Sequence, residues 1–131
     1  MLYMFMLYYD DSNPPPAEAL SAVIGAHNAL GQQARQSNTY VWSEAVGNRA
    51  SAKTVRVNNG NTLTTDGPFI ESKELMGGFY ILDCKDLDEA LGIAAQFPEA
   101  TYGAVEVRPV MLIPGSDYGT RAGDRVRQPI G

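Results

Sequence analysis

Cysteine and histidine are nearly absent from this sequence, and their scarcity excludes several kinds of site. The 131 residues contain one cysteine, Cys84, and one histidine, His27. A single cysteine cannot form an internal disulfide bond, a CxxC redox motif or a thiolate zinc cluster. The common phosphate-loop, dinucleotide, serine-hydrolase and zinc-protease motifs are missing as well. We therefore expect a site that uses neither a metal nor an organic cofactor, and we interpret Cys84 as a small hydrophobic residue.

Positive charge is also scarce. Lys and Arg together number 10 against 15 Asp and Glu, which gives a formal net charge of −5. This balance argues against nucleic acid and anionic membranes as partners, because both are bound through Lys and Arg. The apolar run at residues 1–9 is too short to span a bilayer and lacks the basic segment and cleavage site of a signal peptide. We expect one soluble, cytoplasmic, globular domain.

The hydrophobic pattern predicts an α+β protein. Residues 2–9 are apolar at nearly every position, which is typical of a strand buried on both faces. Further strands are predicted at residues 39–46, 77–84 and 104–112, and the NNGN turn predicts a hairpin within residues 52–67. A helix should start at Ala17 and end near residue 37, and a second, capped by Asp86, should cover residues 86–97. The predicted apolar faces of the two helices are Leu20, Val23, Ile24, Leu30 and Ala34, and Leu87, Leu91, Ala94 and Ala95.

This order is β-α-β, an inserted hairpin and β-α-β, which is the ferredoxin-like arrangement with both helices on one face of an antiparallel sheet. The other face would be bare, although residues 2–9 are apolar on both sides. A bare face of that kind would form a large exposed apolar patch. We therefore predict a homodimer in which a second subunit covers it. The domain should comprise residues 1–112, and residues 113–131, rich in Gly and Arg, should form a tail.

His27 is the residue best suited to acid–base chemistry, because histidine titrates near neutral pH. It lies on the sheet-facing stripe of the first helix, where a histidine is also often a satisfied structural side chain. Glu106 and Arg108 should face the space between the two sheets of the dimer. They either pair with each other or with the second subunit, or they hold a ligand, with Arg108 on an anionic group. Tyr80 belongs to a set of aromatic residues that could line a pocket or fill the core.

The stretch TTDGPFIESKELMGGFYILD, residues 64–83, combines a rigid turn, several charges and a glycine pair. Asp66 and Gly67 suit a tight turn, and the following proline restricts it further. Lys73 lies in the charged part and could contact a ligand. The adjacent Gly77 and Gly78 would allow close approach of the backbone to a ligand or a neighbouring loop. We interpret the segment as a fixed lip over a pocket, hinged at the glycine pair.

The segment DGPFIESKELMGGFYILD, continued by DLDEALGIAAQFP and YGAVEVRPV, resembles the YCII-related family in its DGPF-motif branch, and the resemblance extends over residues 1 to about 112. Ile70 differs from the small residue usual in that branch. The resemblance implies a dimeric α/β-barrel built from ferredoxin-like subunits. The matching residues are Asp66, Gly67, Pro68, Phe69, Glu71, Ser72, Lys73, Glu74, Gly77, Gly78, Glu106, Val107, Arg108 and Pro109.

The resemblance also bears on the site. The YCII branch proper pairs a histidine on the first helix with an aspartate near the end of the second. His27 matches the histidine, but Phe97 precedes Pro98 where that branch has the aspartate. We therefore expect Asp66 to supply the carboxylate.

Three functions are compatible with the sequence. The first is a small-molecule-binding protein or cofactor-independent enzyme, in which His27 is the acid or base, Asp66 assists it and Arg108 holds the ligand. The second is a regulatory module that contacts a sigma factor or another transcription protein through residues 71–74 and the tail. The resemblance implies this alternative, because some DGPF-branch proteins resemble partners of alternative sigma factors. The third is a structural dimer. Close approach of His27 and Asp66 beside a cavity would favour the first.

Overall fold

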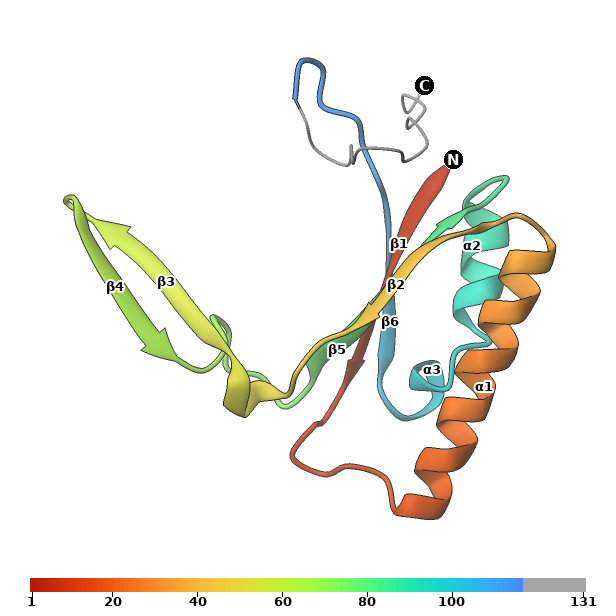
Figure 1. The fold of residues 1–131 in the computed structure, drawn as a ribbon, viewed down its shortest axis with the longest axis horizontal. Helices are drawn as coiled ribbons and strands as arrows, with labels where there is room; N and C mark the ends of the chain where they lie inside the picture. The colour runs from red at the N-terminus through yellow and green to blue at the C-terminus, as the bar shows by residue number, and fades with distance from the viewer. Residues whose placement is uncertain (117–131) are drawn as a thin grey trace.

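The computed structural model describes residues 1–116 and forms an α+β fold with two antiparallel sheets (Figure 1). The elements run β1, α1, β2, η1, β3, β4, β5, α2, α3 and β6 along the chain. Their bounds are Leu2–Tyr9 (β1), Ala17–Gln36 (α1), Tyr40–Ala45 (β2), Arg49–Ser51 (η1, a 3-10 turn), Lys53–Asn58 (β3), Asn61–Asp66 (β4), Leu75–Asp83 (β5), Leu87–Ala94 (α2), Glu99–Tyr102 (α3) and Ala104–Pro109 (β6).

The main sheet has four strands in the order β2-β5-β1-β6, and every neighbouring pair is antiparallel. The helices α1 and α2 cover one face of this sheet, and the other face carries no helix (Figure 1). The predicted ferredoxin-like arrangement with an inserted hairpin is therefore confirmed for the single chain. The predicted tail begins within the described part, but its residues 117–131 lie outside it.

The core lies between the sheet and the helices. Alternate residues of β1, namely Tyr3, Phe5 and Leu7, are buried there together with Leu82 and Phe97. Because side chains alternate along a strand, the intervening residues of β1 lie on the face without helices. We call this the open face; it carries Leu2, Met4, Met6, Tyr8, Trp42, Phe79, Ile81, Glu106 and Arg108.

The helix α2 contacts the sheet through smaller residues than the sequence suggested. Ala90 and Ala94 of α2 are buried, whereas Leu87 and Leu91 are exposed. On α1, Leu30 and Ala34 pack against the core as predicted, but Leu20 and Ile24 are exposed. The predicted faces were thus partly wrong. Small side chains let a helix axis approach a sheet closely, and the bulky leucines then point outward.

The hairpin β3–β4 forms an arm, residues 53–66, that stands apart from the main sheet (Figure 1). Asn59 and Gly60 have φ values of 51° and 78°, as the predicted two-residue turn requires. Exposed apolar side chains, including Val55, Val57 and Leu63, line the strands. An isolated two-stranded hairpin is marginally stable in water, so the arm is a candidate contact surface.

The loop that follows the arm is fixed from one side by Arg49. Its guanidinium donates to the backbone carbonyls of Ser72 and Lys73 at 3.1 and 2.9 Å, and its Nε donates to Asp11 at 2.5 Å. This hydrogen bond holds the pKa of Asp11 below its ordinary value. The loop is therefore tied to the segment after β1, and the interpretation as a rigid element has a physical basis.

The proposed hinge at the glycine pair is wrong. Gly77 and Gly78 both lie inside β5, where Gly78 pairs with Leu7 and Ala45. A side chain at Gly77 would collide with the ring of Tyr9, and one at Gly78 would lie 2.9 Å from the carbonyl oxygen of Glu44. The glycines are needed for close packing against neighbouring strands.

Cys84 is expected to be unreactive in the native protein. It is 1% exposed, and burial raises the pKa of its thiol to about 11. Because the thiolate is the attacking species, only about a thousandth of the thiol is reactive near pH 8. A chromogenic disulfide reagent should therefore titrate the thiol only after denaturation. Rapid reaction of the folded protein would contradict this burial.

Candidate functional site

Three polar side chains from separate elements meet on the helix-covered face of the sheet. His27 of α1 lies between Tyr80 of β5 and Glu99, the first residue of α3. The Nδ1 atom of His27 is 3.0 Å from the Tyr80 hydroxyl, and Nε2 is 2.6 Å from Oε1 of Glu99. Both ring nitrogens are thus held by side chains. We call these residues the His27 cluster.

Local sequence places each member. His27 occupies a sheet-facing position of α1, and Tyr80 alternates with open-face residues of β5. Pro98 ends the preceding turn and is followed at once by Glu99. The ring of Phe97 packs against those of His27 and Tyr80, at centroid distances of 5.7 and 4.8 Å. This packing fixes the imidazole between its two partners.

The cluster is largely shielded from water. The side chain of His27 is 20% exposed and that of Glu99 is 7% exposed. Burial raises the pKa of Tyr80, and the nearby Glu99 carboxylate adds to the effect, so Tyr80 is a protonated phenol at neutral pH. When Glu99 is ionised, its carboxylate only accepts hydrogen bonds, and Nε2 of His27 is then the donor to Glu99. In the neutral imidazole, Nδ1 is then free to accept from the Tyr80 hydroxyl.

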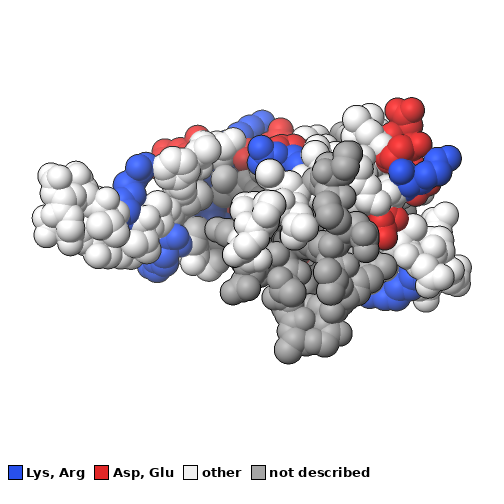
Figure 2. All heavy atoms as spheres, turned by 90° about the horizontal axis from the view of Figure 1, so that it is seen from above, with Lys and Arg blue, Asp and Glu red and all other residues white. Residues whose placement is uncertain are grey.

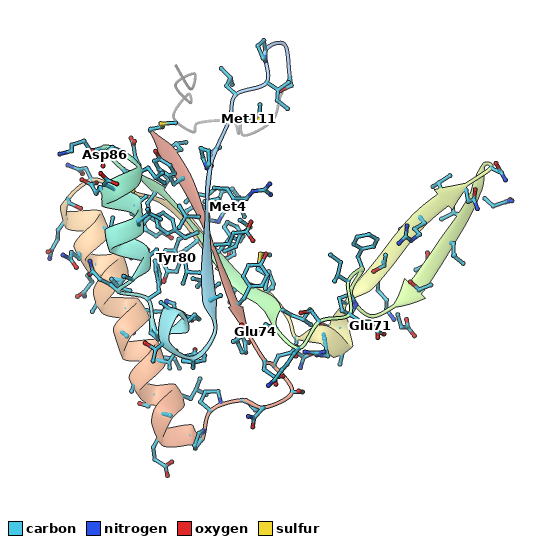
Figure 3. All side chains as sticks on the ribbon, turned by 180° about the vertical axis from the view of Figure 1, so that it is seen from behind. Met4, Glu71, Glu74, Tyr80, Asp86 and Met111 are labelled. Carbon is cyan, nitrogen blue, oxygen red and sulfur yellow. The ribbon has the colours of Figure 1, made fainter. Side chains whose placement is uncertain are left out.

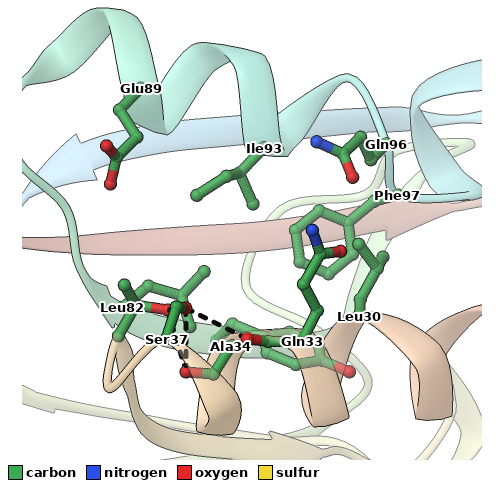
Figure 4. Close-up of a pocket in the computed structure, with 11 residues that line it drawn as sticks. Leu30, Gln33, Ala34, Ser37, Leu82, Glu89, Ile93, Gln96 and Phe97 are labelled. Atoms are coloured by element: carbon green, nitrogen blue, oxygen red, sulfur yellow. Dashed lines mark hydrogen bonds between the residues drawn. The ribbon is translucent and has the colours of Figure 1, made fainter.

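A cavity of about 400 Å³ adjoins the cluster, between α1 and α2 (Figure 4). Tyr80 and Phe97 belong to its lining and also contact His27. The full lining comprises Leu30, Gln33, Ala34, Ser37, Thr39, Tyr80, Leu82, Glu89, Ile93, Gln96 and Phe97. A molecule in this cavity would therefore touch Tyr80, which is hydrogen-bonded to the histidine.

The structure does not bring Asp66 to His27 within the chain. Asp66 ends β4, at the base of the arm, and forms an exposed ion pair with Lys53. The carboxylate bonded to His27 is that of Glu99 instead. Gly67 has the predicted unusual conformation, with φ of 96°, at a bend of the backbone.

The other predicted ligand residues divide between locations. Tyr80 lies in the His27 cluster, on the helix side of the sheet. Lys73 follows Glu71 by two residues in the loop held by Arg49, and Figure 3 shows Glu71 beside the arm and away from Tyr80. Glu106 and Arg108 are exposed on the open face and form an ion pair at 3.6 Å. An inter-sheet pocket containing all of them is therefore not present in the single chain.

Sequence reasoning missed Glu99 and treated Phe97 only as a departure from a family pattern. The weak signal for Glu99 was its position, two residues after the place where the YCII branch has its aspartate. A one-turn helix such as α3 has no detectable period, so its orientation could not be predicted.

Charged side chains are scattered over the surface seen in Figure 2, without one broad basic patch among the coloured residues. In residues 1–116, no three His, Cys, Asp or Glu side chains gather in a way that could hold a metal ion. Within the same residues, no helix has the length and apolar character needed to cross a membrane.

Comparison with known proteins identifies a family. The sequence model described as the YCII-related domain matches residues 1–114. An uncharacterised protein, R00369 of Rhizobium meliloti (strain 1021), is 47% identical over 64 residues, which are 47% of this chain and 52% of that protein. The match thus spans about half the length of this curated relative.

Among solved structures, a similar chain is that of the 5-chloro-2-hydroxyhydroquinone dehydrochlorinase TftG from Burkholderia phenoliruptrix AC1100, in complex with 2,5-dihydroxybenzoquinone. Its TM-score is 0.48 at 16% sequence identity, and the alignment covers 84% of this chain and 93% of that one.

Proposed function

The chain belongs to the YCII-related domain family, and we propose that it binds a small organic molecule and transfers a proton on it, without a cofactor, through the His27 cluster. The observation that supports this most directly is the continuous chain of contacts from Glu99 through His27 to Tyr80, at 2.6 and 3.0 Å. Tyr80 continues this chain into the wall of the cavity.

The roles of the three residues follow from their hydrogen bonds. A bound molecule gives a proton to the Tyr80 oxygen while the Tyr80 proton moves to Nδ1 of His27. The resulting imidazolium is balanced by the Glu99 carboxylate, and the reverse transfer returns the proton to the product. Tyr80 is the catalytic residue that touches the substrate, and Glu99 is a positioning residue. The arrangement uses the same logic as carboxylate–histidine–hydroxyl triads.

Stability alone gives no reason for a buried polar pair at this position. Apolar side chains of similar volume often fill such a space equally well or better. The presence of a polar pair where apolar side chains would stabilise the fold as well favours a chemical role over a purely structural one.

The proposal is tested by proton exchange. Small carbon acids such as ketones and activated phenols are incubated in D₂O with the protein, and deuterium incorporation is followed by NMR. We expect the wild-type protein to accelerate exchange of at least one compound class, and Tyr80→Phe and Glu99→Gln to reduce that rate by about a hundredfold or more. Equal rates with wild type and Tyr80→Phe would refute the proposed function.

We further propose that the protein is a homodimer joined through the open face. Apolar side chains of three adjacent strands, Met4, Trp42, Phe79 and Ile81, lie there without a helix to cover them. The arm, with its exposed valines, supplies further apolar surface. A second copy of the chain would cover this apolar face of the sheet.

A further inference from the structure

The cavity between α1 and α2 has properties that define the ligand it accepts. Its volume of about 400 Å³ lies in the range of sites for small organic molecules. Its floor is β5, through Tyr80 and Leu82, and its sides are the two helices (Figure 4). A compact organic molecule would fit in this space.

The inner wall is apolar and partly aromatic. Leu30, Leu82 and Ile93 contribute aliphatic surface, and the rings of Tyr80 and Phe97 lie 4.8 Å apart with an interplanar angle of 55°. Aromatic rings favour offset or tilted contacts with other rings. This wall is therefore suited to a flat ring system.

The polar part of the lining is rich in amides and lacks cations. In the described part of the chain, the side-chain amide of Gln33 has no hydrogen-bond partner, and that of Gln96 makes one long contact of 3.4 Å. The hydroxyls of Ser37 and Thr39 are already engaged with backbone carbonyls of α1. Two amides are thus available for a ligand's donors and acceptors.

The charge of the cavity lining distinguishes neutral from anionic ligands. Glu89 is the one charged residue in this lining, and no Lys, Arg or His belongs to it. A carboxylate placed there would approach Glu89 with no cation among the lining residues to compensate it, which is unfavourable in a partly buried site. This differs from the sequence-based expectation that Arg108 holds an anionic ligand, because Arg108 lies on the open face.

We propose that this cavity binds a small, uncharged aromatic molecule whose ring carries hydroxyl or amide groups, and that it discriminates against carboxylates. The inference rests on the proposed function only in taking Tyr80 as the group that meets the ligand. It adds the chemical class of the ligand, which the His27 cluster alone does not define.

The test compares 4-hydroxybenzamide with 4-hydroxybenzoate, which share a ring and differ in one charged group. Affinities are measured by protein-observed NMR titration. We expect the amide to bind at least about tenfold more tightly than the carboxylate, and Glu89→Gln to narrow this gap mainly by improving binding of the carboxylate. Equal affinities of the two compounds for the wild-type protein would overturn the proposal.

Location is tested with a matched pair of substitutions. Ile93→Trp should fill the cavity and abolish binding of the amide, whereas Ile24→Trp, at an exposed position of α1, should not. Binding that survives Ile93→Trp would place the ligand elsewhere and refute the inference. The two proposals can fail separately. A wild-type protein that binds the amide but does not accelerate proton exchange would contradict only the proposed function. Glu99→Gln should lose proton exchange and still bind the amide as the wild type does.

Discussion

Replacing His27 with alanine is expected to lower the free energy of unfolding by about 3 kcal/mol, because it leaves a buried carboxylate unpaired. Glu99 is buried, with its side chain 7% exposed. Within residues 1–116, its Oε1 is bonded to His27 and its Oε2 has no hydrogen-bond partner. Urea denaturation at a fixed protein concentration measures the change, since the stability of an oligomer depends on concentration.

Two controls test whether the loss of stability in His27→Ala comes from the burial of Glu99 or would follow from breaking any pair of this kind. The double substitution His27→Leu/Glu99→Leu should recover most of the loss, because apolar residues of similar size can replace a buried pair. Lys53→Ala breaks the pair with Asp66, whose side chains are 60% and 87% exposed, and should cost less than about 1 kcal/mol. If His27→Ala cost no more than Lys53→Ala, the assigned burial of Glu99 would be wrong.

The second large effect concerns assembly: Ile81→Glu should raise the dimer dissociation constant at least about a hundredfold. Ile81 lies on the open face, opposite Met4 on β1 and Trp42 on β2. In the proposed dimer its substitution would bury a carboxylate without a partner, at a cost of about 3 kcal/mol, and each 1.4 kcal/mol changes an affinity about tenfold. Sedimentation velocity over a dilution series measures the dissociation constant.

Ile24→Glu is the matched control, because it places the same charge on an exposed position of α1. It should remain dimeric. Circular dichroism should show that Ile81→Glu is folded, since position 81 borders solvent in a monomer. A wild-type protein that sediments as a monomer at micromolar concentration, or an unchanged dimer in Ile81→Glu, would refute the open-face interface.

Much of the fold was readable from local patterns. Three of these patterns each involve only a few residues: the apolar run of residues 2–9, the turn at Asn59 and Gly60, and the helix cap at Asp86. The Asp86 side chain accepts a hydrogen bond from the backbone N–H of Glu89 at 2.9 Å. Local signals of this kind survive in the folded state because packing agrees with them. Helix faces were less predictable. Leu87 and Leu91 follow helical spacing as well as Ala90 and Ala94 do, and only the tertiary contact decides which pair is buried.

The site was harder to predict because its members are distant in sequence. His27 and Tyr80 were both identified, from the titration range of one and the aromatic character of the other. Their partner Glu99 is 72 residues from His27, on a helix too short to have a pattern. Asp66 was expected in its place because Phe97 stands where the YCII branch has its aspartate. The turn motif around Asp66 has a structural explanation that needs no catalytic task.

The two ends of the arm lie close together, and this allows the length and sequence of the arm to vary. The backbone N–H of Gly67 donates to the carbonyl oxygen of Ala52 at 2.8 Å, so the chain leaves and re-enters at neighbouring points. The entropy of closing a loop grows slowly with its length. Insertions, deletions or whole replacements between these two residues can therefore change what the protein recognises while the sheet, the helices and their chemistry stay as they are.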